Sequence, residues 1–378
     1  MSTRTLEFLI PGDLQRATGG YVYDRTMVAG LRALGWRVEV HGLDASFPSP
    51  SPDALAHAGR VFAALPDQAC VLVDGLALGA MPEVLEPHAR RLGVIALIHM
   101  PLASEFGIAA TIAEHRRREE QRALELVRHV IVTSRITEQA LAAYGVDRSR
   151  LTVVEPGVWK TQTLGSRPGI RAGDGALELL CVATLQEGKG HELLIDALAP
   201  LAHLPWRLQC VGSLSRNSPT VQRVVERLQR VGLRDRVALI GEVPHAALSE
   251  LYLGADLFVL PTLRESYCLA VAESLAHGLP VISSRTGAIP ELVKTAGLLI
   301  EPGDLKALHA ALARTLTDHT LRLSLRAAAL AARARLTAWP EACGRMARVL
   351  ERVCGQVAQE RAARQGATGC VEPRPTRA

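Results

Sequence analysis

The sequence predicts an α/β protein made of two parallel-sheet domains, and three observations support this prediction. The chain has 378 residues, which is enough for two domains of about 150–200 residues each. Short apolar runs alternate with longer amphipathic stretches, as expected when each parallel strand is followed by a covering helix. A polar, glycine-rich stretch after residue 160 divides this alternation into two similar halves.

The first half contains a series of short apolar runs that predict strands. They lie at 5–10, 36–41, 70–73, 94–98, 129–133 and 151–154. Amphipathic stretches between them predict helices, notably at 20–35, which ends at a glycine, and at 110–128, which is rich in Arg and Glu. The alternation of strands and helices indicates a parallel sheet.

The second half repeats this pattern. Its predicted strands lie at 177–183, 207–211, 237–240, 257–260 and 280–282, and Ala- and Arg-rich helices follow from 304 to 358. We therefore predict an N-terminal domain over 1–160, a linker over 161–176 and a C-terminal domain over 177–338. The helix over 339–358 is expected to cross back to the N-terminal domain, and the polar tail over 359–378 is expected to be disordered.

Composition narrows the function classes. The net charge of +5 is spread along the chain and aromatic residues make up only 4%, so a nucleic-acid groove is not predicted. No apolar run reaches the roughly 20 residues of a membrane span. Seven cysteines without close pairs indicate reduced thiols, and thus a cytoplasmic protein. The run Arg116–Arg118 predicts a solvated helix face or, alternatively, a peripheral contact with anionic lipid at the inner membrane face.

The first chemical motif surrounds Lys189. A predicted strand leads through Gly188-Lys189-Gly190 into a helix, and only four lysines occur in the whole chain. The free N–H groups at a helix start attract anions, so a lysine there suits a diphosphate. The alternative is an ordinary solvated loop lysine. No Ser or Thr follows the lysine, which excludes a P-loop.

The second motif spans 261–281 and contains Glu265 and Glu273, which seven residues separate. If a helix begins near Tyr267, Glu265 lies in the loop before it, and Glu273 projects from an otherwise apolar helix. Ribose hydroxyls would satisfy Glu273, and Glu265 could face a sugar. The backbone amides of residues 266–269 could hold phosphate. A pair of surface glutamates is the alternative interpretation.

Together these segments resemble glycosyltransferase family 4. Residues 261–281 resemble its Glu-x7-Glu donor motif, the Lys189 loop its phosphate-binding loop, and Ser284–Val293 its G-x-x-P-E-L-V turn. The resemblance spans roughly residues 5–355 and is weaker in the first half. It implies the GT-B fold, with two Rossmann-like parallel-sheet domains facing across a cleft, and a retaining, metal-independent hexosyltransferase. The nucleoside-diphosphate sugar would be the co-substrate, with no further cofactor.

The resemblance also implies roles for single residues. Lys189 matches the residue that neutralises the departing diphosphate, Glu273 the one that binds ribose, Glu265 the one that contacts the donor sugar, and His99 the active-site histidine. The remaining expected donor-site residues are Gly19, Gly20, Gly212, Val243, Ser266, Tyr267, Cys268 and Leu269.

Two positions depart from the family pattern. Thr184 and Leu185 stand where many members have an arginine, so Lys189 is expected to neutralise the diphosphate with less help. Cys268 stands where many members have glycine, and its side chain could narrow the phosphate pocket.

The predicted reaction is therefore sugar transfer with retention, by front-face attack or through a covalent intermediate. Electrostatic stabilisation of the leaving diphosphate is its main requirement. Because no D-x-D motif stands beside a strand, no metal site is expected. The absence of G-x-G-x-x-G disfavours a nicotinamide-dependent oxidoreductase. A sugar-nucleotide epimerase and a weakly catalytic nucleotide-sugar sensor remain alternatives, and the acceptor is open between lipid, small metabolite and glycan.

Overall fold

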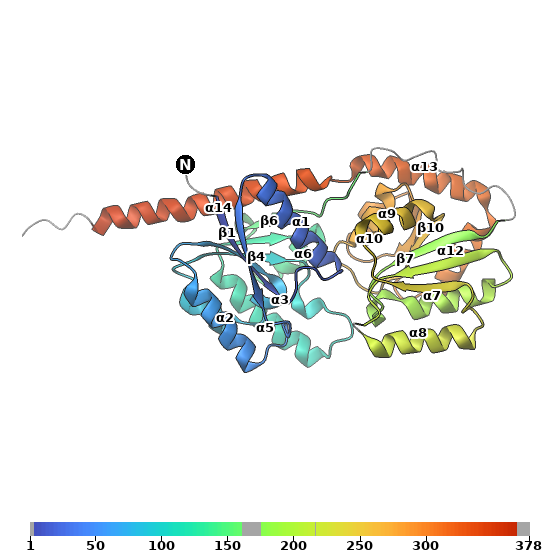
Figure 1. Ribbon diagram of the computed structural model, residues 1–378, viewed down its shortest axis with the longest axis horizontal. Coiled ribbons are helices and arrows are strands. Elements are labelled where there is room, and N and C mark those ends of the chain that lie inside the picture. The colour runs from blue at the N-terminus through green and yellow to red at the C-terminus, as the bar shows by residue number, and fades with distance from the viewer. Residues whose placement is uncertain (1–3, 161–174, 216, 369–378) are drawn as a thin grey trace, which may run out of the picture.

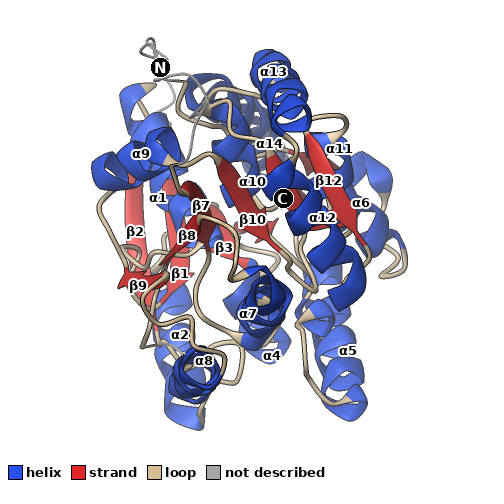
Figure 2. Ribbon diagram, turned by 90° about the vertical axis from the view of Figure 1, so that its right-hand side faces the viewer, coloured by secondary structure: helices blue, strands red, loops and turns tan. Residues whose placement is uncertain are grey.

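The computed structural model describes residues 4–160, 175–215 and 217–368. Two parallel sheets lie side by side along the long axis of the molecule, and helices cover both faces of each sheet (Figure 1). Figure 2 shows the same arrangement along that axis, with strands enclosed between helices. The prediction of an α/β protein with two parallel-sheet domains is confirmed.

The N-terminal sheet has the strand order β2-β1-β3-β4-β5-β6. Its strands are β1 (Thr5–Pro11), β2 (Arg37–Leu43), β3 (Cys70–Asp74), β4 (Gly93–Ile98), β5 (His129–Val132) and β6 (Leu151–Val153). All residues of β3, β4 and β5 are buried, which explains their uninterrupted apolar runs. The helices of this half are α1 (Gly19–Ala33), α2 (Pro52–Ala64), α3 (Gly75–Leu78), α4 (Pro82–Leu85), α5 (Ala110–Leu126) and α6 (Arg135–Ala142).

The C-terminal sheet has the order β12-β11-β10-β7-β8-β9. Its strands are β7 (Leu177–Val182), β8 (Trp206–Val211), β9 (Val237–Gly241), β10 (Leu257–Leu260), β11 (Val281–Ser284) and β12 (Gly297–Ile300). β12 was not predicted, because a run of four apolar residues after a short helix has no detectable period.

The C-terminal half contains most of the remaining helices. They are α7 (His191–Leu198), α8 (Ser218–Arg230), α9 (His245–Gly254), α10 (Leu269–Ala276), α11 (Ile289–Val293), α12 (Leu305–Thr317) and α13 (His319–Arg335). Short 3-10 turns include η2 (Leu102–Ser104) and η4 (Glu187–Lys189).

The last helix, α14 (Trp339–Thr368), returns from the C-terminal half and runs along the N-terminal sheet (Figure 1). Its apolar residues Met346 and Leu350 share a core with Phe8 of β1 and Met27 of α1. Leu9, the next residue of β1, faces the opposite side and packs in the core of α2 and α5. The alternation of a strand therefore places α14 on one face of this sheet and α2 on the other.

The structure bears on two expected segments, the disordered C-terminal tail and the linker between the domains. The helix α14 continues to Thr368, where a disordered tail was predicted from residue 359, because Ala and Arg, both strong helix formers, dominate this stretch. The prediction is wrong for residues 359–368, and the rest of the tail lies outside the described residues. The predicted linker, 161–176, also lies almost wholly outside them.

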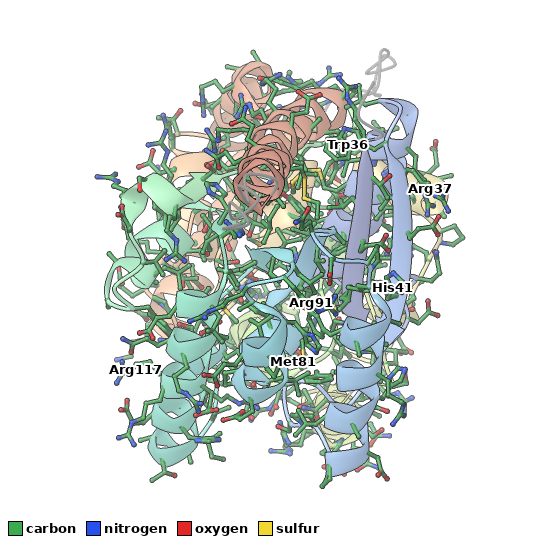
Figure 3. All side chains as sticks on the ribbon, turned by 90° about the vertical axis from the view of Figure 1, so that its left-hand side faces the viewer. Trp36, Arg37, His41, Met81, Arg91 and Arg117 are labelled. Carbon is green, nitrogen blue, oxygen red and sulfur yellow. A yellow bond between two sulfur atoms is a disulfide. The ribbon has the colours of Figure 1, made fainter. Side chains whose placement is uncertain are left out.

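The expectation of reduced thiols is wrong for one pair. Cys70, at the start of β3, forms a disulfide with Cys354 of α14, and Figure 3 shows this bond beside the C-terminal helix. The two cysteines are 284 residues apart, so only the return of α14 to the N-terminal sheet brings them together. The thiol argument for a cytoplasmic location does not hold for them. None of the helices in the described part of the chain combines the length and the apolar character that a membrane span requires.

Candidate active site

Lys189 lies in η4, between the carboxyl end of β7 and the start of α7. Its ammonium group donates a hydrogen bond to Oε1 of Glu265 at 2.6 Å. Burial lowers the pKa of Lys189, but the carboxylate of Glu265 outweighs burial and the net shift is upward. Lys189 therefore carries a full positive charge. The structure brings together two residues that the sequence placed in separate motifs.

Glycine at position 190 allows this approach. Gly190 has φ = +72°, and a Cβ atom there would lie 2.2 Å from the carbonyl oxygen of Pro261. The neighbouring Gly188 accepts hydrogen bonds from the N–H of Leu263 at 2.8 Å and from the hydroxyl of Thr262 at 3.1 Å. The Lys189 loop is thus fastened to the loop that follows β10, which leads to Glu265.

The loop from Glu265 to Cys268 rests on the turn after β11. Gly287 has φ = +56°, and a Cβ atom there would lie 2.5 Å from the carbonyl oxygen of Glu265. The N–H of Ala288 donates to the carbonyl oxygen of Ser266 at 3.0 Å. The G-x-x-P-E-L-V turn therefore packs against the backbone of the Glu-x7-Glu motif and holds it in place. Tyr267 is buried, and its hydroxyl donates to the carbonyl oxygen of Pro156 at 3.5 Å.

Cys268 caps the start of α10 in the left-handed backbone region, with φ = +71°. Side-chain-bearing residues adopt this conformation at a cost, whereas glycine does so freely. This explains why glycine is the family residue at this position. Leu269 is the first residue of α10, and the N–H groups of its first turn have no partners within the helix.

Glu273 projects from the middle of α10 and accepts a hydrogen bond from the hydroxyl of Tyr252 at 3.3 Å. Burial raises the pKa of Glu273 to about 7, although the bond from Tyr252 and the charge of Arg25 oppose the shift. Sequence reasoning missed both partners. Tyr252 lies on α9 with no motif around it, and Arg25 comes from α1 in the other half of the chain.

The N-terminus of α1 faces the N-terminus of α10. A Cβ atom on Gly19 would lie 3.8 Å from Cβ of Leu269, and one on Gly20 would lie 3.5 Å from the ring of His99. Two helix starts therefore converge on one region, where their dipoles favour negative charge. Gly19 and Leu269 are thus neighbours, as are Gly20 and His99, and their role in donor binding stays a prediction.

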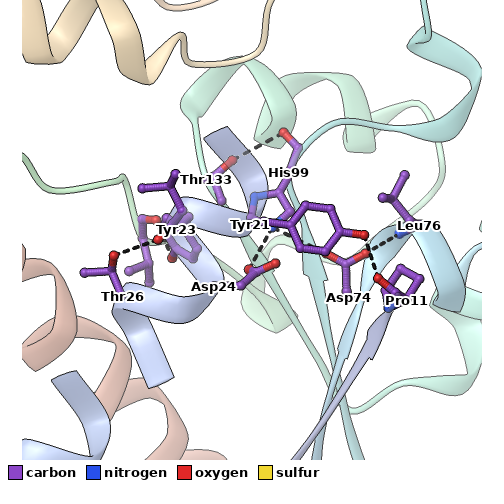
Figure 4. A network of polar contacts seen from close by, with 11 residues as sticks. Pro11, Tyr21, Tyr23, Asp24, Thr26, Asp74, Leu76, His99 and Thr133 are labelled. Atoms are coloured by element: carbon purple, nitrogen blue, oxygen red, sulfur yellow. Dashed lines mark hydrogen bonds and ion pairs between the residues drawn. The ribbon is translucent and has the colours of Figure 1, made fainter. Parts of the chain in front are cut away.

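His99, directly after β4, is held between two carboxylates (Figure 4). Its Nε2 lies 2.9 Å from Oδ1 of Asp24 and 3.5 Å from Oδ2 of Asp74. Burial lowers the pKa of His99, but the two aspartates outweigh burial and raise the pKa to about 10. The ring is therefore an imidazolium at neutral pH.

The backbone around His99 is also fixed. Its carbonyl oxygen accepts hydrogen bonds from the hydroxyls of Thr133 at 3.3 Å and Thr137 at 3.2 Å. The edge of the Tyr23 ring packs against the imidazole, with the ring centroids 5.3 Å apart. Sequence reasoning missed Asp74, whose position at the end of a buried strand was the available signal.

Gly212 and Val243 follow β8 and β9 at the same edge of the C-terminal sheet. The N–H of Gly212 donates to the carbonyl oxygen of Gly241 at 2.9 Å. Val243 is half-buried against the C-terminal core. Gly212 packs against the start of the loop that leads to Lys189, since a Cβ atom there would lie 2.1 Å from the carbonyl oxygen of Ala183.

The two halves also touch near the Lys189 loop. The guanidinium of Arg264 donates to the carbonyl oxygen of Ser104 in η2 at 2.9 Å. A Cβ atom on Gly188 would lie 3.2 Å from Cβ of Phe106. Both contacts join the segment from Ser104 to Phe106 of the N-terminal half to loops of the C-terminal half.

Although the sequence predicts no metal site, two groups of side chains in the described residues have ligand spacing. One is Asp24, Asp74 and His99, and the other is Cys181, His191 and Cys210. In the first group the imidazolium of His99 offsets the charge of one of the two carboxylates. The fold therefore brings together side chains with metal-ligand spacing that no motif in the sequence indicates.

The comparisons with known proteins agree with this geometry. Residues 166–331 match the family "Glycosyl transferases group 1". A D-inositol 3-phosphate glycosyltransferase of Xylanimonas cellulosilytica is 32% identical over 233 residues, covering 57% of this chain and 55% of that protein. An MMP alpha-(1->4)-mannosyltransferase of Mycolicibacterium hassiacum is 27% identical over 288 residues, covering 72% of this chain and 67% of that protein. The chain thus matches only about half the length of the inositol-phosphate relative.

Solved structures share the fold. The sucrose-phosphate synthase of Thermosynechococcus elongatus superposes with a TM-score of 0.77 at 22% identity, over 93% of this chain and 100% of that chain. HepE of Anabaena, solved with UDP and glucose, superposes with a TM-score of 0.69 at 18% identity, over 92% and 99%. Residues 166–331 of the chain are therefore similar to the glycosyltransferase group 1 family, and the chain as a whole shares the two-domain fold of these structures.

Proposed function

We propose that the protein transfers a sugar from a nucleoside-diphosphate sugar to a hydroxyl acceptor with retention of configuration. The observation that supports this best is the Lys189–Glu265 pair, which lies in the loops that lead into α7 and α10. A cation beside the start of a helix forms an anion site that suits a diphosphate.

Lys189 would stabilise the leaving group. In the unliganded chain its ammonium pairs with Glu265. A bound diphosphate would offer two negative charges at the same place, so the ammonium would exchange its partner or share it. As the bond to the sugar breaks, negative charge grows on the diphosphate, and a preorganised cation stabilises that charge most in the transition state.

The two glutamates would bind different parts of the donor. Glu265 lies at the ammonium of Lys189 and would face the sugar, where positive charge develops during transfer. Glu273, whose carboxylate lies deeper along α10 beside Tyr252, would accept hydrogen bonds from the ribose hydroxyls.

His99 would act as a charged hydrogen-bond donor. The aspartates hold its Nε2, which leaves Nδ1 for an oxygen of the donor or acceptor. Because the raised pKa keeps the ring protonated at neutral pH, we assign His99 an orienting and electrostatic role and not that of a general base.

The acceptor is a lipid, small metabolite or glycan, and the surface favours none of them. The arginines of this run are all paired within the chain, because Arg117 and Arg118 share Glu114 at 2.8 and 2.9 Å and Arg116 pairs with Glu105. Figure 3 shows Arg117 at the outer edge of α5. This pairing supports the solvated helix face over a patch for anionic lipid.

The experiment that tests the function is incubation of the protein with a panel of radiolabelled nucleotide sugars. A transferase releases nucleoside diphosphate slowly without acceptor and faster with one. An epimerase would convert the donor sugar without releasing the diphosphate, and a sensor would bind without turnover. Release should continue in excess EDTA. Loss of release in EDTA that magnesium or manganese restores would contradict the metal-independent mechanism.

A further inference from the structure

Three metal-binding side chains meet beneath the Lys189 loop, in the core of the C-terminal half. Cys181 on β7 and Cys210 on β8 are direct partners in the parallel sheet. His191, the first residue of α7, places its Nε2 3.7 Å from Sγ of Cys181. One ligand atom from each residue lies within 4.8 Å of the other two.

The burial of His191 is not explained by the hydrogen bonds that it makes. Cys181 is 0% exposed, His191 2% and Cys210 3%. Both cysteines are free thiols. Within the described residues, Nδ1 of His191 has no hydrogen-bond partner, so the imidazole contacts only a weakly polar thiol. A buried imidazole is costly unless its nitrogens are satisfied, and Nε2 here faces only a thiol, a weak partner that a metal ion would replace.

We propose that Cys181, His191 and Cys210 form a binding site for a thiophilic divalent cation of the zinc class. Thiolates select soft or borderline ions over Mg²⁺ and Ca²⁺, which prefer oxygen. Binding would release the two thiol protons to solvent. Two thiolates, a neutral imidazole and a divalent cation form a neutral complex, whereas Cu⁺ would leave a net negative charge in the core.

The geometry of the unoccupied residues fits such an ion. A sulfur and a nitrogen bound to one tetrahedral zinc lie about 3.6 Å apart, which follows from bonds of about 2.3 and 2.0 Å. The 3.7 Å between Cys181 and His191 matches this separation.

The site adjoins the Lys189 loop but shares no ligand with it. Its three ligands are buried, whereas the side chain of Lys189, two residues before His191, is 22% exposed. The proposal holds whether or not the protein transfers sugar, and it is compatible with transfer that continues in EDTA.

The test is metal titration of the full chain, purified without a histidine tag, freed of metal with chelator and kept in a phosphine reductant. Added Co²⁺ should give a thiolate-to-metal charge-transfer band and intense visible bands of a tetrahedral site, saturating at one equivalent. Zn²⁺ should then abolish these bands and raise the melting temperature.

Variants locate the site. The double variant Cys181→Ser with Cys210→Ser should lose the bands, and His191→Gln, which keeps both thiols, should bind at least about ten-fold more weakly. Cys343→Ser, a change of a buried free cysteine in α14, is the matched control and should bind like the parent. All these variants keep Cys70 and Cys354, so a band from that pair would survive in the double variant.

The outcomes are decisive in both directions. Circular dichroism identifies variants that do not fold, and His191→Gln alone then decides. No cobalt band in the parent protein, or a band that persists in the folded double variant, would overturn the proposal. Equal weakening by Cys343→Ser and His191→Gln would also contradict it.

Discussion

The two halves of the proposed active site hold their charges in different ways. In the C-terminal half a single ammonium pairs with a single carboxylate, and the side chains of Lys189 and Glu265 are 22% and 11% exposed. In the N-terminal half one imidazolium lies between two carboxylates, and the side chains of Asp24 and Asp74 are only 1% and 4% exposed.

This difference suggests two functions for charge. The Lys189 pair joins two loops and can open, because a bound diphosphate replaces the carboxylate as the partner of the ammonium. The His99 cluster has an excess of buried negative charge around the ring, so the ring keeps its proton and its orientation. One half therefore offers an exchangeable charge and the other a fixed one.

Removing the exchangeable charge should have the largest effect. Lys189→Ala should lower turnover about 10²-fold or more, because the leaving diphosphate loses its cation in a site that excludes water. The measurement is kcat with saturating donor. Lys306→Ala, a change of an exposed lysine on α12, is the control and should turn over like the parent. Unchanged turnover in Lys189→Ala would contradict the assignment of this loop.

The partner carboxylate should affect chemistry more than binding. Glu265→Gln should lower kcat about 10-fold or more, because its charge stabilises a positive centre that exists only during transfer. Calorimetry should find nucleoside-diphosphate affinity nearly intact. Lost nucleotide binding with a normal kcat would reverse the roles that we assign to the two glutamates.

Glu273 should show the opposite pattern. Glu273→Gln should mainly raise the donor KM, since ribose contacts are equal in ground and transition states. Because burial raises the pKa of Glu273 to about 7, the carboxylate gains its charge as the pH rises through neutrality. The parent donor KM should therefore fall over that range, and the variant should lose this dependence.

Weakening the fixed charge of His99 should change the pH dependence of activity. In Asp24→Asn the pKa of His99 should move down from about 10, so the imidazolium is lost at lower pH. Activity of the variant should then decline as the pH rises above neutrality, by about 10-fold at the alkaline end, while the parent stays flat. The measurement is the pH profile of kcat/KM, and superimposable profiles would contradict the fixed imidazolium.

The same group should affect stability. The pKa of His99 is raised from 6.5 to about 10, so its contribution is complete below the lower value and is lost as the pH rises through the upper one. Denaturant unfolding of the parent should show this alkaline loss, which should begin at lower pH in Asp24→Asn.

The sequence predicts these two regions unequally. Lys189, Glu265 and Glu273 could be found because loops that bind a diphosphate need glycines and charges at fixed spacings along the chain. Asp24 could not be found in this way, because a single acidic residue in an amphipathic helix is normally expected to face solvent. Its burial arises only when α1 packs over the end of β4, where His99 neutralises it.

Contacts between residues far apart in the chain could not be predicted from the sequence either. The strands were predictable because burial on both faces leaves continuous apolar runs. The Cys70–Cys354 disulfide was not, because it depends on the return of α14 across the N-terminal sheet. Tyr252, the partner of Glu273, likewise comes from a helix with no motif of its own.

The smallest predicted effect concerns the backbone of the exchangeable half. Cys268 holds a positive φ of +71° at the start of α10, a conformation that costs a residue with a side chain about 1–2 kcal/mol. Cys268→Gly and Cys268→Ala both remove the buried thiol, so the difference between them isolates the backbone. The glycine variant should be more stable by about 1 kcal/mol, or about 2–4 °C in Tm. At Cys210, within β8, the order should reverse, because glycine weakens a strand. If alanine equals or exceeds glycine at position 268, the loop that presents Glu265 does not have the left-handed turn, and the geometry of the exchangeable pair must be different.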